Sequence, residues 1–310
     1  MFVKGPMLFA DRRTFLKNTL GGLAGMMLMG RRSEAQAAIT TTPLGDNLFL
    51  LAGAGANIVA RTGSEGVILV DGGSSEHAGA LAQAVAGLPG GRPVRTLFNT
   101  HWHPEHTGSN LALGRAGATI IAQENTRLWL TQEITWPWDN QTFRPLPKEA
   151  QPNRTFYDKG ALDFDGEHIT YGYLLQAHTD GDLYVFFPKS NVLVIGDVIS
   201  GGGWPLVDWW TGGWINGIVS GLDTLLKVAN DQTRVVAGQG PVLTRADLDA
   251  QHKMFAAIAQ KLRTFMFGGR NIDDVLAAQP TREYDDKMGD PKQFLRLSFQ
   301  SMWGHFTPDA

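Results

Sequence analysis

Residues 99–110 read Asn-Thr-His-Trp-His-Pro-Glu-His-Thr-Gly-Ser-Asn, and this stretch decides how the rest of the chain is interpreted. It holds three histidines and one carboxylate within six positions, namely His101, His103, Glu105 and His106. Imidazole nitrogens and carboxylate oxygens are ligands that divalent zinc accepts. Histidines are costly to bury together, because each ring nitrogen needs a hydrogen-bond partner. The run therefore predicts a metal site, with an exposed polar loop rich in histidine as the alternative.

Further polar side chains stand at the points where predicted strands end. Short apolar runs predict these strands at residues 67–70, 94–98, 171–176 and 192–195. The polar residues that follow them are Asp71, His101, His178 and Asp197. Strand ends of an α/β sheet can converge on one edge, where such proteins bind ligands. We therefore expect these four side chains to lie close together.

Strands and helices alternate along the chain, which argues for an α/β fold with helices packed outside the sheet. The 310 residues are 43% hydrophobic and 18% charged, an ordinary globular composition that fits one large domain. Thr244 and Asp247 form a capping-box pattern at the start of a long helix predicted to run to Leu262. Residues 272–278 and 292–303 predict further C-terminal helices.

Composition and charge exclude several classes of function. The formal net charge is −3 and no basic tract lies beyond the N-terminus, so no nucleic-acid partner is expected. The sequence contains no cysteine, which excludes disulfides, zinc–thiolate sites and a cysteine nucleophile. A metal site in this chain must therefore use nitrogen and oxygen ligands.

The N-terminal 37 residues read as a targeting segment. Residues 11–17, Asp-Arg-Arg-Thr-Phe-Leu-Lys, resemble the twin-arginine export motif, and residues 18–30 form a weakly apolar run. That run is shorter than the roughly 20 apolar residues that span a bilayer, so no stable membrane span is expected. Ala35-Gln36-Ala37 supplies an A-x-A cleavage site. The alternative is an amphipathic N-terminal helix.

Cleavage after Ala37 would leave residues 38–310 as a single mature domain. The twin-arginine route carries folded proteins, so a metal ion could be loaded before export. We therefore expect a periplasmic protein with two kinds of partner, the twin-arginine export machinery and a small-molecule substrate.

Two irregular stretches are rich in tryptophan. The first, residues 134–152, also contains four prolines, and a long irregular loop inside a compact domain is often a lid or a binding loop. The second, residues 200–216, follows Asp197 and is rich in glycine. These loops could wall an apolar pocket for a ring-bearing or acyl substrate, or their tryptophans could pack the core. The tryptophans expected to contact substrate are Trp136, Trp138, Trp204 and Trp209.

Five short motifs together make the chain resemble the metallo-β-lactamase superfamily, from Leu44 to about Leu248. They are Leu69-Val70-Asp71-Gly72, residues 100–108, Ala177-His178-Thr179, Ile195-Gly196-Asp197 and Gly238-Gln239-Gly240-Pro241. The resemblance implies a four-layer αββα sandwich with metal ions at the edge of the sheets. The predicted C-terminal helices would be additions to that sandwich.

The resemblance also implies which residues hold the metal ions. The first site would consist of His101, His103 and His178. The second site would consist of Glu105 and His106, with Asp197 bridging the two and Gln239 at the place of a further ligand. Asp71 would fix a histidine tautomer from behind the ligands.

This chain departs from the family pattern at two positions of the second site. Glu105 stands where the family has aspartate, and its longer side chain brings the oxygens to a different point. Gln239 stands where the family has a final histidine, and an amide oxygen is a poorer zinc ligand than imidazole. We therefore expect one tightly bound zinc ion and weak or absent binding of a second.

The chemistry that follows is hydrolysis. A zinc ion held by three histidines keeps a fourth position for water, whose pKa can fall to about 7 from 15.7 in bulk. The resulting hydroxide can attack a carbonyl carbon, with Asp197 or Glu105 as general base. The leading function is therefore a periplasmic zinc hydrolase that acts on a lactam, lactone, ester or thioester.

Two other functions stay open on the sequence alone. One is a mononuclear iron oxygenase, because the persulfide dioxygenases of the same superfamily use a site like His101, His178 and Asp197. Export from the thiol-rich cytoplasm counts against it. The other is a non-catalytic metal- or ligand-binding protein, because two second-site ligands have changed. Retention of all first-site histidines counts against that function.

Overall fold

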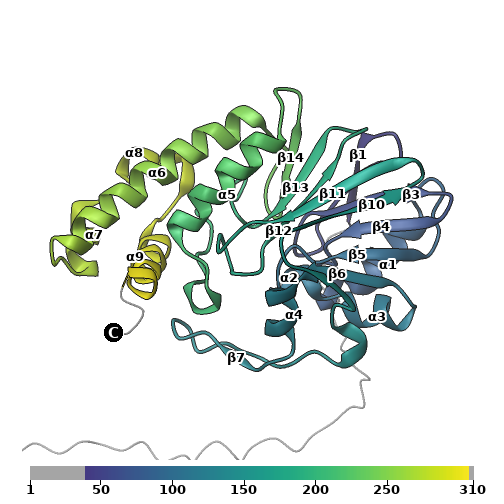
Figure 1. Cartoon of the computed structure of the whole chain (residues 1–310), viewed down its shortest axis with the longest axis horizontal. Coiled ribbons are helices and arrows are strands. Elements are labelled where there is room, and N and C mark those ends of the chain that lie inside the picture. Colours follow the sequence, from purple (N-terminus) through teal and green to yellow (C-terminus); the bar gives the residue numbers. More distant parts are fainter. Residues whose placement is uncertain (1–38, 307–310) are drawn as a thin grey trace, which may run out of the picture. The chain divides into compact units, whose positions relative to one another are not determined.

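Two β-sheets form the centre of residues 39–306, the part of the chain that the computed structural model describes (Figure 1). The predicted export motif and cleavage site lie outside these residues. The first sheet contains, in order, β1 (Thr40–Gly45), β2 (Leu48–Ala52), β3 (Ile58–Gly63), β4 (Gly66–Val70), β5 (Val94–Phe98), β6 (Thr119–Gln123) and β9 (Arg154–Phe156). Strands β1 to β4 pair antiparallel, whereas β4, β5, β6 and β9 pair parallel. The strands predicted at residues 67–70 and 94–98 therefore end at the same edge of this sheet.

The second sheet contains, in order, β10 (Lys159–Phe164), β11 (Glu167–Tyr173), β12 (Leu183–Phe187), β13 (Val192–Gly196), β14 (Arg234–Ala237) and β15 (Leu243–Thr244). Its neighbouring strands pair antiparallel except β13 and β14, which pair parallel. A short hairpin of β7 (Ile134–Thr135) and β8 (Thr142–Phe143) interrupts the first irregular stretch. Residues 134–152 are therefore less irregular than the sequence suggests.

Apolar side chains from both sheets meet in one buried layer between them. The first sheet contributes Val59, Ile68, Val70, Phe98 and Ile121, and the second contributes Ile169, Val185, Phe187, Val194 and Val236. All five residues of β4 and of β13 are buried, as expected for strands covered on both faces. This layer fixes the two sheets against each other and so fixes the distance between residues at their edges.

Helices cover the outer face of each sheet (Figure 1). On the first sheet, Leu81 and Val85 of α1 (Ala78–Ala86) join a buried cluster, and α3 (Asn110–Arg115) adds Leu113. On the second sheet, α5 (Ile215–Val228) and α6 (Arg245–Phe267) contribute Leu222 and Phe255 to another. The predicted four-layer αββα sandwich is confirmed. Two short helices, α2 (Pro104–Thr107) and α4 (Glu124–Leu130), lie in the connections near the histidine run.

The predicted C-terminal helices are present, with one more between them. Helix α6 begins at the predicted capping box, in which Thr244 and Asp247 exchange side-chain-to-backbone hydrogen bonds. It is followed by α7 (Ile272–Ala278), α8 (Arg282–Met288) and α9 (Lys292–Phe306). Helix α8 was not predicted, because it buries none of its residues and so shows no apolar periodicity. These helices pack beside α5 and α6 (Figure 1).

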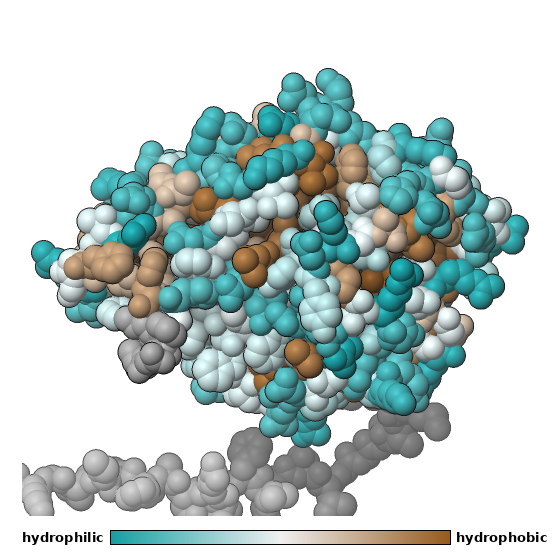
Figure 2. Space-filling model, viewed as in Figure 1, coloured by the Kyte–Doolittle hydropathy of each residue, from teal (hydrophilic) through white to brown (hydrophobic). Residues whose placement is uncertain are grey.

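The surface shows no continuous apolar face on the side drawn in Figure 2, where hydrophobic residues form separate patches among hydrophilic ones. Within residues 39–306, no helix combines the length and the apolar character needed to cross a bilayer.

Candidate metal centre

The candidate metal ligands come from both sheets and meet at one edge. His101 and His103 follow β5, and His106 lies one turn further on, in α2. His178 follows β11, and Asp197 follows β13 directly. The strand ends converge as the sequence predicted. Their ligand-bearing atoms form two groups whose members all lie within 4.8 Å of one another.

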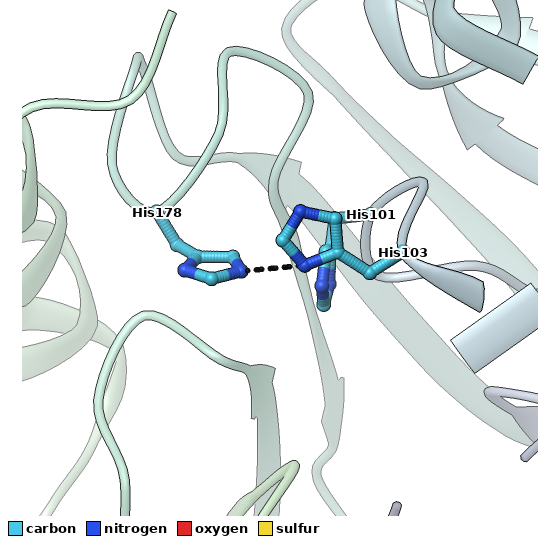
Figure 3. Close-up of side chains that lie close together, drawn as sticks. All are labelled: His101, His103 and His178. Carbon is cyan, nitrogen blue, oxygen red and sulfur yellow. Dashed lines mark hydrogen bonds between the residues drawn. The ribbon is translucent and has the colours of Figure 1, made fainter. Parts of the chain in front are cut away.

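The first group consists of His101, His103 and His178 (Figure 3). All three side chains are buried. The ring of His178 points at that of His103, and His178 Nε2 lies 3.1 Å from His103 Nδ1 (Figure 3). The ring of His101 lies with its centroid 4.6 Å from that of His103 and 4.7 Å from that of His178. This is the set that the sequence assigned to the first site.

The outer ring nitrogen of each of these histidines has a hydrogen-bond acceptor. His178 Nδ1 lies 2.6 Å from the backbone oxygen of Leu206, and His103 Nε2 lies 3.0 Å from Asp208 Oδ2. His101 Nδ1 lies 3.1 Å from the hydroxyl of Thr100, whose own proton goes to Asp71. These partners accept protons, so each outer nitrogen carries the ring's N–H. The inner nitrogens are left with lone pairs.

Three lone pairs therefore converge without a proton between them. His103 Nδ1 and His178 Nε2 face each other at 3.1 Å, although neither nitrogen carries a hydrogen in this tautomer. His101 Nε2 is buried and has no hydrogen-bond partner. Unpaired buried acceptors are costly, and a cation bound to all three would satisfy them. The donor set, three imidazoles with fixed tautomers, fits a zinc ion.

The protonation states agree with this geometry. Burial lowers the pKa of His178 to about 4, with the nearby His103 as the next cause. Burial, followed by His106, His103 and His178, lowers the pKa of His101 well below its ordinary value. Both imidazoles are therefore neutral at neutral pH, the state that a metal ion requires of a histidine ligand.

The second group consists of His101, His106 and Asp197. His106 Nε2 lies 3.3 Å from Asp197 Oδ2, and Asp197 Oδ1 has no hydrogen-bond partner. Burial opposes charge on both residues, but their mutual attraction outweighs it. The pKa of Asp197 falls to about 2, and the pKa of His106 rises well above its ordinary value with Asp71 adding to the effect. The Asp197 side chain is 18% exposed, although its Oδ1 is buried.

Asp71 supports both groups from one position. It follows β4 with a φ of 68°, in the left-handed region that aspartate tolerates better than most residues. Its Oδ2 accepts from His106 Nδ1 at 2.9 Å and from the Thr100 hydroxyl at 2.9 Å. Its Oδ1 accepts from the backbone nitrogen of Thr100 at 2.8 Å. Asp71 therefore orients His106 directly and His101 through Thr100.

Two residues assigned to the second site from the sequence lie outside both groups. Glu105 is partly buried in the first turn of α2 and belongs to neither group. Gln239 is exposed, and its amide nitrogen donates to the backbone oxygen of Gly55 at 2.7 Å. The structure thus brings together five of the seven residues proposed as ligands.

The sequence did not reveal Asp208, which is fully buried behind His103. Its Oδ2 accepts from His103 Nε2 at 3.0 Å, from the Thr211 hydroxyl at 2.6 Å and from Trp136 Nε1 at 3.2 Å. Burial opposes its ionisation, but the contact with His103 outweighs burial and lowers the pKa of Asp208. Asp208 is the one charged residue of the stretch 198–222. A lone charge in an otherwise uncharged stretch is the sequence feature that could have indicated its role.

The four tryptophans expected to contact substrate divide into two pairs. Trp136 is 8% exposed and packs edge-on against His103, with ring centroids 5.2 Å apart. Trp204 stacks on Phe294 of α9 and donates to the backbone oxygen of Gly289. Both make packing contacts, as the alternative interpretation held. Trp138 and Trp209 also pack against the core and, in addition, line a surface pocket.

Comparison with known proteins identifies the fold. A family model, the Metallo-beta-lactamase superfamily, matches residues 52–258. A metallo-beta-lactamase from Pontibacter korlensis is 16% identical with a TM-score of 0.56, over 70% of this chain and 99% of that one. The DIM-1 metallo-beta-lactamase is 18% identical with a TM-score of 0.54, over 70% and 97%. The sec-alkylsulfatase Pisa1 from Pseudomonas sp. is 15% identical with a TM-score of 0.64, over 88% and 51%. No curated protein matches significantly.

The family model covers more than half of the chain, and the layers and strand ends agree with it. The chain therefore belongs to the metallo-β-lactamase superfamily. Its cluster of His101, His103 and His178 is suited to binding a metal ion.

The space beside Asp197 depends on Gly238. A Cβ atom at Gly238 would overlap Asp197 Oδ1 and lie 2.7 Å from His106 Cε1. Gly238→Ala is therefore expected to lower the free energy of unfolding by about 1–3 kcal/mol, as overpacking does. Chemical denaturation of the chelator-treated protein measures this loss.

Gly79→Ala in α1 is the matched control, because its Cβ meets no atom within 4 Å. It is expected to raise stability by about 0.5–1 kcal/mol, the cost of glycine in a helix. A Gly238→Ala protein as stable as wild type would show that the space around Asp197 is not filled.

Asp208→Asn keeps the shape of the side chain and removes its charge. Zinc affinity, measured by chelator competition, is expected to fall about 10- to 100-fold, because the acceptor that orients His103 becomes a neutral amide oxygen and no longer raises the basicity of the imidazole. Asp163→Asn is the control, since it removes the carboxylate of an exposed histidine pair, with Asp163 Oδ1 2.7 Å from His168 Nδ1. Equal affinities in the two variants would contradict the role given to Asp208.

Proposed function

We propose that the chain is an exported zinc-dependent hydrolase that acts on a carbonyl substrate, namely a lactam, lactone, ester or thioester. The observation that carries the proposal is the convergence of three unprotonated imidazole nitrogens, one from each of His101, His103 and His178. Their tautomers are fixed by acceptors on the far side of each ring. Such a set holds a zinc ion and leaves a fourth position for water.

A zinc ion bound there would supply Lewis acidity and a water whose pKa is near about 7. The chain would supply a hydrogen-bond acceptor for this water. Asp197 is ionised at neutral pH, because its pKa is about 2, and its Oδ1 has no hydrogen-bond partner. Its side chain is also partly exposed. We assign Asp197 the role of orienting the attacking water by accepting a hydrogen bond from it.

The second group is expected to bind metal weakly. Its two imidazoles and one carboxylate gain no further ligand from Glu105, which lies outside the group, or from Gln239, whose amide is bonded to Gly55. His106 Nε2 and Asp197 already face each other as an ion pair. These features support one zinc ion per chain, with His106 retaining Asp197 in place.

The contact geometry favours zinc hydrolysis over the iron-oxygenase alternative. An oxygenase site would gather His101, His178 and Asp197 around one ion. Among residues 39–306, His178 is grouped with His101 and His103, and Asp197 is grouped with His101 and His106, so neither group contains both His178 and Asp197. The fixed tautomers argue against a binding protein that holds no metal ion, because such a site does not require them.

Zinc content tests the proposal. Protein purified without added metal is expected to contain one zinc ion per chain, measured by elemental analysis. His178→Ala is expected to lose this ion and hydrolytic turnover together, because it removes one of three ligands. His168→Ala, at an exposed histidine, is the control and should keep both.

The substrate screen covers lactams, lactones, esters and thioesters, with alkyl sulfate esters added because of the fold similarity to Pisa1. One iron ion per chain would instead favour the iron-oxygenase function. Full zinc content and turnover in His178→Ala would overturn the site assignment.

We also propose that residues 1–37 direct export by the twin-arginine route, on the sequence of the Arg12-Arg13 motif. Replacing both arginines by lysine keeps the charge and is expected to retain the protein in the cytoplasm. Cell fractionation measures this, with Arg31→Lys/Arg32→Lys as the matched control. Undiminished export of the Arg12→Lys/Arg13→Lys protein would contradict the proposal.

A further inference from the structure

A surface pocket of about 220 Å³ lies between the tryptophan-bearing loops and the C-terminal helices. Trp138 and Trp209 line it from the loops, and Ile272 lines it from α7. Leu297 and Phe299 of α9, which are 4% and 5% exposed, contribute buried apolar surface. An apolar cavity of about 150 Å³ binds benzene, so this pocket has room for one aromatic ring or a short alkyl chain.

A single cationic side chain adds charge to this apolar pocket. Arg296 of α9 lines it, and 54% of its side chain is exposed. Its ion-pair partner is Asp273, whose Oδ1 lies 4.0 Å from Arg296 Nη2 and whose side chain is 84% exposed. A pair this long and this exposed is weak. The guanidinium can therefore turn to a bound carboxylate, sulfonate or sulfate and hold it by two parallel hydrogen bonds.

We propose that this pocket is a binding site for a small amphiphilic anion, with an aromatic ring or short alkyl group packed against the two tryptophans and an anionic group on Arg296. The site is distinct from the candidate metal centre and does not depend on the proposed hydrolase activity. The match to the family model ends at residue 258, and five of the eight residues that line the pocket lie beyond it.

The pocket has a short structural connection to the metal centre. Trp209 follows Asp208, which accepts the hydrogen bond from His103. Trp138 stacks on Trp136, with centroids 5.0 Å apart, and Trp136 donates to the same Asp208 carboxylate. A ligand packed against Trp138 and Trp209 would thus contact one residue next to Asp208 in the chain and one residue that stacks on its hydrogen-bond donor Trp136.

Isothermal titration calorimetry with 4-phenylbutyrate tests the site, and 4-phenylbutan-1-ol is the uncharged counterpart. The wild-type chain is expected to bind the acid, with or without zinc, and to bind the alcohol more weakly. Arg296→Gln should weaken binding of the acid about tenfold and leave the alcohol unchanged, because one charge-assisted contact is lost. Arg296 is exposed, so this variant is expected to fold.

Three further variants sharpen the test. Lys292→Gln removes an exposed charge one turn earlier on α9 and should bind the acid like wild type. Asp273→Asn should tighten binding a few-fold, because it removes the carboxylate that competes for Arg296. Ile272→Trp should fill the pocket and abolish binding of both probes, and circular dichroism checks its fold.

The proposal is overturned if the wild-type chain binds neither probe, or if Arg296→Gln and Lys292→Gln weaken the acid equally. Sedimentation velocity tests whether a second copy of the chain covers the pocket. Self-association of the wild-type chain that is lost in Ile272→Trp would show that it does, and would also overturn the proposal. Because binding is measured on chelator-treated and zinc-loaded protein alike, failure of the hydrolase proposal leaves these outcomes unchanged.

Discussion

The candidate metal centre depends on one buried carboxylate, that of Asp71, at the end of a strand covered on both faces. Its two oxygens accept three hydrogen bonds, two from Thr100 and one from His106. Because β4 and β5 are parallel neighbours, these bonds join two strand ends at the point where the histidine run begins. A buried carboxylate without such donors would be strongly destabilising, so the loop that carries the ligands and the turn that carries Asp71 require each other.

Three different acceptors fix the three histidine tautomers of the first group. A hydroxyl, a carboxylate and a backbone carbonyl occupy the outer sides of His101, His103 and His178. Because all three acceptors belong to the folded chain, the inner nitrogens present their lone pairs before any ion binds. The imidazoles have little freedom to turn, so little ordering remains to be done when an ion binds, and pre-organised ligands bind more tightly for that reason.

The sequence predicted the parts of the structure that follow from local pattern. The apolar runs ending at Asp71 and before His101 were strands with nearly the predicted bounds, and the capping box at Thr244 starts α6 as expected. Asp208 escaped prediction because its partner His103 lies 105 positions away, across a loop without periodicity. The lengths and directions of such loops come from tertiary packing, and a single sequence carries no record of that packing. The same holds for Trp136. The composition of its loop suggested a pocket wall, but its indole nitrogen donates a hydrogen bond to Asp208.

The ligands of the first group are divided between the two sheets, with His101 and His103 following a strand of one and His178 following a strand of the other. During synthesis the first sheet is complete by residue 156, more than twenty positions before His178 is made. A chain at that stage holds two imidazoles of the group, too few for a stable site. Tight metal capture thus reports that the halves of the sandwich have closed on each other. A bound ion would therefore link the two sheets at this edge and stabilise their association.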